Sequence, residues 1–486
     1  MNVGIRRVGL AVTALLLLLV GQLTYLQVVD AKTLSHHEGN GRDRLKDLRS
    51  PRGTIVSADN QILAISKPSG DEYHLQRDYP LGALTSAVVG YQSIVVGSTG
   101  LESTYSAVLS GRDQTGHSLR DRTIDFFRGT TTVGNLTTSL RVDAQLVAKN
   151  ALADQKGSVV VLDPTTGEII VMYSNPSFDP QPLAGHTAAK VQAAFDFLNN
   201  DPAKPSLARA YREIYPPGST FKVVTTTAAL DAFPDTVNRV FPSRSSLPIP
   251  LSDRPIGNFG GRTCGGDLET VFTNSCNTAF AQLGLDLGNL FPPAMQKFGI
   301  YERPPLDIAP GAVASAGPTA DSFDQNKPRF ALAGIGQGDV FTTPLQMALV
   351  AGGIANGGVI MRPHAGKEIL DDEGKLLTRI KPTEWQRATT PETAAQLTDL
   401  MTKVVDRGTG TAARIPGISV AGKTGTAQTV EGAAPHAWFV AFAPAEAPRY
   451  AIAVLVENGG SQGGDATGGH LAAPIAKQVL QFLLGA

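Results

Sequence analysis

The sequence of 486 residues is poor in the residues from which metal sites and nucleic-acid surfaces are built. It has two cysteines, eight scattered histidines and a net charge of −1. A zinc site needs histidine or cysteine at ligand spacing, and no such cluster occurs in the sequence. A nucleic-acid binder needs a basic stripe, which is also missing. We therefore expect no metal or other cofactor and no nucleic-acid partner.

Long apolar runs are equally scarce, and the longest lies at the N-terminus. Arg6 and Arg7 precede a mainly apolar stretch at residues 8–29. About 20 such residues span a bilayer as a helix. No small-x-small cleavage pattern follows, which favours an uncleaved transmembrane signal anchor over a cleaved signal peptide. The arginines predict that residues 1–7 are cytoplasmic. We expect a single-pass protein of the cytoplasmic membrane whose remaining residues lie on the extracytoplasmic side.

The rest of the chain has the composition of a globular protein, with 42% hydrophobic and 17% charged residues. Its length allows two or three domains. Residues 30–154 carry no recognisable chemistry, so we expect a non-catalytic extracytoplasmic domain there. Alternation and turn signals within it predict the following elements: strands at 54–57, 62–66 and 131–138, and helices at 100–111 and 143–153.

Residues 155–486 are expected to form a second domain. It opens with two β-branched runs around a turn at 163–167, a strong hairpin signal. It closes with strand candidates at 419–430, 437–443 and 450–456 and an apolar helix at 471–484. Strands at both ends with helices between them predict an α+β fold, one mostly antiparallel sheet covered by helices. The glycine-rich residues 459–469 lack a P-loop ending and are interpreted as a flexible crossing.

A serine and a lysine stand three residues apart at the start of an apolar run. Ser219 and Lys222 follow Pro216, Pro217 and Gly218, which interrupt regular structure. The pattern predicts that Ser219 lies on the first turn of a buried helix, with the Lys222 amine within reach of its hydroxyl. A lysine of lowered pKa activates a serine as a nucleophile. About one such pair is expected by chance, so the spacing alone is weak.

Two further short motifs each occur once. Ser275 and Asn277 form Ser-x-Asn in VFTNSCNTAF, and Lys423, Thr424, Gly425 and Thr426 form Lys-Thr-Gly-Thr in VAGKTGTAQTV. Singly, Ser-x-Asn could merely cap a helix and Thr424 could be an ordinary strand residue. In the order Ser-x-x-Lys, Ser-x-Asn, Lys-Thr-Gly the three are a strong signal.

The three motifs resemble those of the penicillin-recognising serine acyltransferases. The stretches SPRGTI, GLESTY, GSVVVLDPTTGEII, AGIGQG with FTTPLQMA, and AGKTGTAQ with WFVAFAP are similar, in order, to class B penicillin-binding proteins. The resemblance covers about 430 residues from Arg49 onward. It implies the penicillin-recognising transpeptidase fold on an elongated α+β pedestal at 30–154. One departure is Ala208 before Arg209, where the family commonly has Asn-Arg.

The resemblance implies a peptidoglycan D,D-transpeptidase of cell-wall synthesis and cell division, acylated by β-lactams. Ser219 would attack a stem pentapeptide ending in D-Ala-D-Ala and release D-alanine. Lys222 would be the base, kept neutral by burial and by repulsion from Lys423. Ser275 would relay a proton to the leaving nitrogen. Asn277 would orient Lys222 and bind the peptide bond of the substrate.

The remaining assignments concern how the substrate is held. By resemblance, the backbone N–H groups of Ser219 and Thr426 form the oxyanion hole. Gly425 is expected to leave room for the substrate to lie along the strand edge. The hydroxyls of Thr424 and Thr426, with Lys423 as counter-charge, suit the terminal carboxylate.

Several alternatives stay open. Cys264 and Cys276 form either a disulfide of an exported domain or two buried thiols. A non-catalytic β-lactam sensor, a divisome scaffold and a D,D-carboxypeptidase fit the same motifs. The anchor and the large preceding domain argue against a β-lactamase. No glycan-polymerising domain is evident, so the resemblance implies a SEDS-type glycosyltransferase partner together with division proteins.

Overall fold

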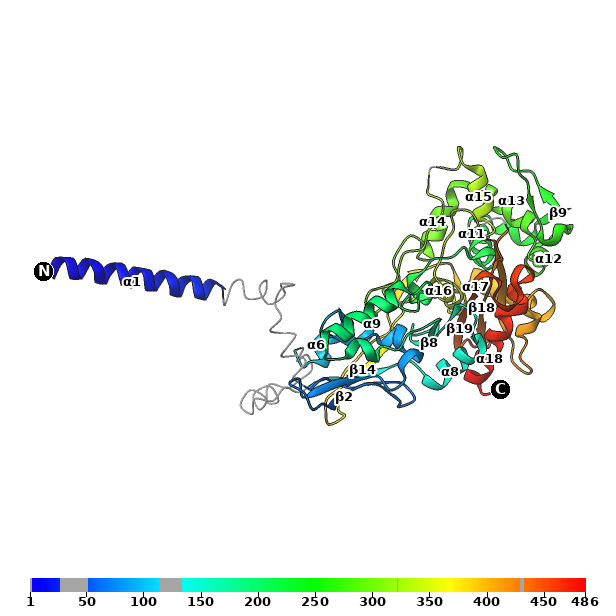
Figure 1. Ribbon diagram of the computed structural model, residues 1–486. Coiled ribbons are helices and arrows are strands. Elements are labelled where there is room, and N and C mark those ends of the chain that lie inside the picture. Colours follow the sequence, from blue (N-terminus) through cyan, green and yellow to red (C-terminus); the bar gives the residue numbers. More distant parts are fainter. Residues whose placement is uncertain (1, 27–50, 113–132, 321, 429–431) are drawn as a thin grey trace.

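The computed structural model describes residues 2–26, 51–112, 133–320, 322–428 and 432–486. Helix α1 (Asn2–Thr24) stands at the N-terminus (Figure 1). Within the described residues it is the one helix long and apolar enough to cross a membrane, and none of its 6–24 window is buried. It covers most of the predicted anchor, whose residues 27–29 lie outside the described ranges. A lipid-facing segment is expected to leave its apolar side chains uncovered in this way.

A five-stranded antiparallel sheet forms the core of the C-terminal part (Figure 1). The predicted hairpin supplies two strands and the three terminal candidates supply the others. In spatial order they are β17 (Ala421–Ala427), β18 (His436–Ala443), β19 (Tyr450–Val456), β7 (Gly157–Leu162) and β8 (Ile169–Asn175). The predicted antiparallel sheet is confirmed. Because β17 is an edge strand, one of its sides can accept an extended peptide.

Helices bury both faces of this sheet. Successive residues of a strand point to opposite faces, so Val159 and Val161 pack with α8 (Val142–Leu152) and α18 (Ala473–Leu484) in one cluster. Val160 and Leu162 pack on the other side with α16 (Pro344–Ala355). This double burial explains why the strands read as continuous apolar runs.

A six-stranded sheet forms the N-terminal part, and the chain supplies it in two pieces (Figure 1). Its order is β15 (Leu376–Arg379), β14 (Gly366–Leu370), β6 (Asn135–Thr138), β1 (Ile55–Val56), β2 (Ile62–Pro68) and β3 (Leu75–Asp78). β14 pairs antiparallel with β6, and β1 pairs parallel with it. Two strands from within residues 155–486 therefore complete the sheet of the preceding segment, which the sequence did not predict.

An element that precedes the proposed boundary at residue 154 also packs with the part that follows it. Helix α8 precedes that boundary, yet it packs against the five-stranded sheet and α18. The predicted helix at 100–111 is broken into α5 (Gly100–Thr104) and α6 (Ser106–Leu109). Elements on each side of residue 154 thus pack with the part of the protein on the other side of that boundary.

A buried ion cluster stabilises the N-terminal part. The Glu102 carboxylate accepts from Arg52 Nε at 2.7 Å and from Arg77 Nε at 2.6 Å, with all three side chains almost fully buried. Burial alone would raise the pKa of Glu102, but the two guanidinium groups hold that pKa below its usual value. Removing one member of such a cluster leaves a buried charge without its partner.

Candidate active site

Ser219 lies on a tight turn at the front of a buried helix. Residues Gly218–Phe221 form a 3₁₀ turn, η4, and α11 (Lys222–Ala232) follows directly. The predicted first helical turn is therefore 3₁₀ in type. Gly218 has φ +55, and a Cβ there would lie 2.7 Å from the Thr426 carbonyl oxygen. Only glycine allows this turn to approach the edge strand β17 so closely.

The loop before Ser219 is held by two elements. Trp438 on β18 donates from Nε1 to the Pro216 carbonyl at 3.0 Å. The Gly218 N–H donates to the Gly336 carbonyl at 2.9 Å. These bonds satisfy backbone groups that would otherwise be buried without partners. The position of the serine is thus fixed by backbone contacts before any substrate binds.

The Lys222 amine is fully buried and points to the Ser-x-Asn motif. It donates to the Ser275 carbonyl at 2.8 Å, to Asn277 Oδ1 at 2.8 Å and to Ser275 Oγ at 3.2 Å. Burial, and then repulsion from Lys423, lower its pKa well below the usual value. We predicted that this amine lies within reach of the Ser219 hydroxyl; the three hydrogen bonds that it makes within the described residues are to Ser275 and Asn277.

The amine of Lys423 also bonds Ser275. Its Nζ donates to Ser275 Oγ at 2.9 Å and to the Thr424 carbonyl at 3.3 Å. Burial lowers the pKa of Lys423 to about 7. The hydroxyl of Ser275 therefore bridges two buried amines. A hydroxyl can accept two bonds and donate one, so this arrangement provides a path for a proton between the amines.

Ser275 occupies an unusual backbone conformation. It follows α12 (Leu268–Thr273) with φ +59, the left-handed region that few non-glycine residues adopt. The Ser275 N–H donates to the Phe272 carbonyl, and the Cys276 N–H donates to the Val271 carbonyl. The helix end thus determines where the hydroxyl points. Strain of this kind is often found at functional sites.

The alternative that the Ser-x-Asn side chains merely cap a helix does not describe the structure. Helix α13 (Asn277–Leu287) begins at Asn277 itself, and its N-cap Cys276 makes no side-chain cap. Asn277 accepts from Lys222 and donates from Nδ2 to the Gly257 carbonyl at 3.0 Å. One N–H of that amide is already used, and the second remains to donate to a substrate. Cys276 is joined to Cys264 by a disulfide.

On β17 the side chains alternate between cleft and core. Thr424 and Thr426 line the cleft, and Thr424 Oγ1 lies 2.6 Å from Thr409 Oγ1. The structure gives a different reason for Gly425 than the one we expected. A Cβ at Gly425 would lie 2.8 Å from the Pro217 carbonyl oxygen and 2.9 Å from Thr220 Cγ2. The glycine lets the turn that carries Ser219 pack against the strand.

These residues open onto one cleft of about 340 Å³. Ser219, Ser275 and Asn277 lie along it, while the amines of Lys222 and Lys423 lie beneath its surface. The three motifs are therefore brought together from three distant parts of the chain. The cleft is also lined by residues to which the sequence assigned no role in the site: Phe259, Arg262, Asn274, Ile335, Gln337, Thr409, Thr411, Ala412, Thr467, Gly468, Gly469 and His470.

The glycine-rich segment 459–469 was interpreted as a flexible crossing, and that interpretation was wrong for its last two residues. Residues Gly468–Ala472 form a helical turn, η10, packed on β17 and β18. A Cβ at Gly468 would lie 2.0 Å from the Trp438 carbonyl oxygen and 2.5 Å from the Gly425 carbonyl oxygen. The glycines are there for close packing at the wall of the cleft.

The described residues hold no group of three or more histidine, cysteine or acidic side chains that could bind a metal ion. The chemistry that this cleft can perform is that of a serine, two buried amines and a bridging hydroxyl. Desolvated amines with lowered pKa values beside a nucleophilic hydroxyl are the features expected of acyl transfer.

Comparisons with known proteins agree with this chemistry. Residues 157–481 match the penicillin binding protein transpeptidase domain, and residues 52–136 match the penicillin binding protein A dimerisation domain. The chain is 39% identical to peptidoglycan D,D-transpeptidase PbpA of Mycolicibacterium smegmatis, over 100% of this chain and 99% of that protein. It is 38% identical to PbpA of Mycobacterium tuberculosis with the same coverage.

Solved structures give the same result. Penicillin-binding protein A of M. tuberculosis as a ceftriaxone acyl-enzyme matches with a TM-score of 0.82 and 35% identity, covering 90% of this chain and 99% of that one. The penicillin G acyl-enzyme of the same protein matches with a TM-score of 0.81 and 36% identity, covering 90% and 100%.

Proposed function

The chain belongs to the class B penicillin-binding proteins and is a peptidoglycan D,D-transpeptidase, and from this premise we propose a role for each residue of the cleft. The observation that carries the proposal is the hydroxyl of Ser275, which lies within 3.2 Å of both buried amines. A neutral amine, a proton path and a nucleophile are the parts that acyl transfer from an amide requires.

In the first half of the reaction Ser219 Oγ attacks the carbonyl of the penultimate D-Ala. Lys222 takes the hydroxyl proton as the substrate draws Ser219 toward it. The backbone N–H groups of Ser219 and Thr426 stabilise the oxyanion. As the C–N bond breaks, the proton passes through Ser275 to the departing nitrogen of D-alanine. The product is an ester between the donor peptide and Ser219.

In the second half an amine of a neighbouring stem peptide attacks that ester. Its proton passes to Lys222, the ester bond breaks, and Ser219 recovers its proton. A cross-link has formed. Water in place of the amine gives hydrolysis, the D,D-carboxypeptidase reaction. A β-lactam enters the same first step, but its opened ring stays attached and blocks the departure site.

The substrate is held along the edge of β17. Thr424 and Thr426 face the cleft from that strand, and their hydroxyls with the Lys423 charge suit a terminal carboxylate. The free side of an edge strand offers backbone groups to a peptide that adds as a further strand. Asn277 donates its second amide hydrogen to the peptide bond of the donor.

We further propose that α1 anchors the protein by a single pass, with residues 1–7 in the cytoplasm and the cleft outside. Arginines before an apolar helix favour this orientation. The chain from residue 30 to 154 is then the pedestal and 155–486 the transpeptidase domain. A SEDS-type glycosyltransferase that supplies glycan, and division proteins, are the proposed partners of the anchor and pedestal.

The site is tested by mass spectrometry of the full chain after incubation with benzylpenicillin. A stable adduct on the peptide that holds Ser219, absent from the Ser219→Ala variant, is expected. An adduct mapped to another peptide would refute the site.

A second assay separates the enzyme from a sensor or scaffold of the same fold. A donor pentapeptide and an acceptor amine should give a cross-linked product and D-alanine. Release of D-alanine without cross-link would instead identify a D,D-carboxypeptidase. Acylation by benzylpenicillin with neither product would identify a sensor.

A further inference from the structure

Two residues that line the cleft, Phe259 and Arg262, come from a ribbon that none of the three motifs includes. We use the name ribbon for residues 239–267, which hold β9 (Val240–Arg244), β10 (Ser246–Leu247), β11 (Ile256–Gly257) and β12 (Cys264–Asp267). It contains four arginines and two aspartates. Arg239 is paired with Asp286 at 2.7 Å. Of the four arginines in this fully described segment, Arg262 is the one that lines the cleft.

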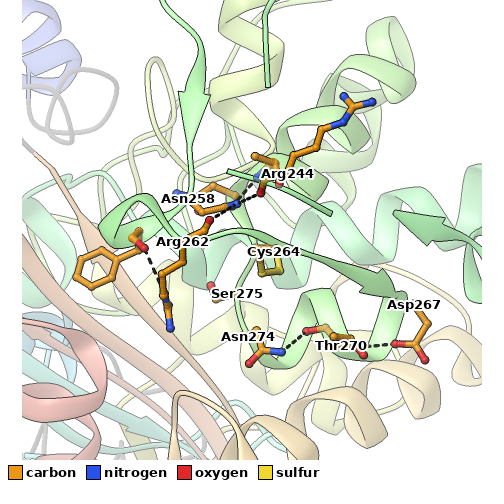
Figure 2. Close-up of a disulfide and its surroundings, with 12 residues drawn as sticks. Arg244, Asn258, Arg262, Cys264, Asp267, Thr270, Asn274 and Ser275 are labelled. Carbon is orange, nitrogen blue, oxygen red and sulfur yellow. Dashed lines mark hydrogen bonds between the residues drawn. A yellow bond between two sulfur atoms is a disulfide. The ribbon is translucent and has the colours of Figure 1, made fainter. Parts of the chain in front are cut away.

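The backbone that carries Arg262 is held firmly. Asn258, 8% exposed, donates from Nδ2 to the carbonyls of Arg244 at 2.7 Å and Arg262 at 3.1 Å (Figure 2). Its Oδ1 accepts from the Thr278 N–H at 3.0 Å and so caps α13. The disulfide of Cys264 joins the ribbon to the Ser-x-Asn motif a second time. The ribbon is therefore joined to the start of α13 by both a hydrogen bond and a disulfide.

The side chain of Arg262 is placed to meet a ligand. It is exposed, and its Nε donates to the Phe259 carbonyl at 3.3 Å. The outer N–H groups remain available, since a guanidinium has five donors. Figure 2 shows Arg262 and Arg244 directed away from each other, with Arg262 on the side of Ser275. Phe259, 58% exposed, lines the cleft beside it.

The described lining of the cleft carries a permanent cation and no carboxylate. Arg262 lies among the lining residues, and none of the described residues that line the cleft is acidic. The terminal carboxylate of the donor is already assigned to β17. An exposed guanidinium next to an exposed ring, on a segment other than β17, fits a second acidic group carried on an alkyl chain.

We propose that Arg262 binds a side-chain carboxylate of the donor stem peptide, on the residue before the D-Ala-D-Ala unit. Arg262 thereby makes the cleft selective for donors in which that group is a free acid over donors in which it is an amide. Phe259 packs against the alkyl part of the same side chain. This inference rests on the proposed function, because it requires a stem peptide as donor.

The test uses two synthetic thioester donors that differ only in a carboxylate or a carboxamide at that position. The rate of Ser219 acylation by each is measured by mass spectrometry on the full chain, with no acceptor amine present. The wild type is expected to favour the carboxylate by about fivefold, the upper range for a solvent-exposed ion pair. Arg262→Gln should bring the ratio to about one, and Arg262→Glu should invert it.

Arg244→Gln is the matched control. It removes an arginine from the same ribbon that points away from the cleft, and it should keep the wild-type ratio. A wild-type ratio near one, or a ratio unchanged in Arg262→Gln, would overturn the inference. A parallel reaction with an acceptor amine added supplies the last outcome: a preference that is absent from acylation and appears only in this aminolysis reaction would also overturn the inference, because it would assign Arg262 to the acceptor.

Failure of the proposed function gives a different result. If benzylpenicillin does not label Ser219, the acyl-enzyme mechanism itself fails and this inference fails with it. If benzylpenicillin labels Ser219 but neither donor acylates it, the mechanism survives and the assigned donor class is wrong.

Discussion

We expect the buried amine of Lys423 to lower the free energy of unfolding of the protein, although the reaction requires this amine. Its pKa is lowered by burial from 10.5 to about 7. A difference of this size corresponds to about 5 kcal/mol of unfavourable free energy whenever the folded protein holds the protonated form. Replacing Lys423 by methionine removes that charge from the core. The hydrogen bond that the charged amine loses to Ser275 is worth about 1.5–3 kcal/mol, which leaves a net gain of about 2 kcal/mol.

The sign of the pH dependence follows from linkage. Below pH 7 both the folded and the unfolded states hold the proton, and the full penalty applies. Between pH 7 and 10.5 the unfolded state holds more protons, so the wild type gains stability as pH rises. Above 10.5 the penalty disappears. The advantage of Lys423→Met should therefore be largest near pH 6 and fade toward pH 10.5.

The assay is the thermal unfolding midpoint of the full chain at pH 6, 8 and 10, beside the acylation rate with benzylpenicillin. At pH 6 Lys423→Met should unfold several degrees above the wild type, while acylation falls about a hundredfold or more. Lys190→Met, at an exposed position, is the control and should change neither quantity. A variant that unfolds below the wild type at pH 6 would refute the reasoning.

Two further predictions concern packing. Gly425→Ala should lower acylation by benzylpenicillin at least tenfold with the Ser219 adduct still at the same peptide, because the new Cβ meets the Pro217 carbonyl at 2.8 Å; an unchanged rate would show that the turn has room to move. Glu102→Ala should destabilise the protein by about 3–5 kcal/mol, since two buried guanidinium groups lose their partner. A shift in the unfolding midpoint no larger than that of Lys190→Met would contradict this.

The five-stranded sheet could be predicted because its strands are apolar, β-branched and bounded by turn residues. Hydrophobic runs such as Val159–Val161 identify strands buried on both faces whatever their neighbours are. The short strand Gly366–Leu370 carries no comparable signal. Its partner β6 is distant in the chain: Asn135 donates to the Asp371 carbonyl across 236 positions. Nothing local in either segment specifies that pairing.

In the candidate site, too, some features could be predicted from the sequence and others could not. Ser219, Lys222 and Lys423 were found because motif order encodes chemistry that depends on residue type. The bond between Asn277 and Lys222 agrees with the predicted orienting role of Asn277. The bonds of Lys222 to Ser275 could not be predicted, because they depend on the left-handed backbone of Ser275. Arg262 was missed because the ribbon is rich in glycine, serine and proline and has no hydrophobic period.

The shared sheet bears on how the protein is made. The six-stranded sheet cannot be completed until β14 and β15 have been synthesised. One edge of β6 therefore stays unpaired while more than 200 further residues are synthesised. A strand edge left open is a template for pairing with other chains. A fragment that begins at residue 155 would retain β14 and β15 without their partner strand β6. Producing the catalytic part alone should therefore require either the preceding segment on the same chain or removal of residues 366–379.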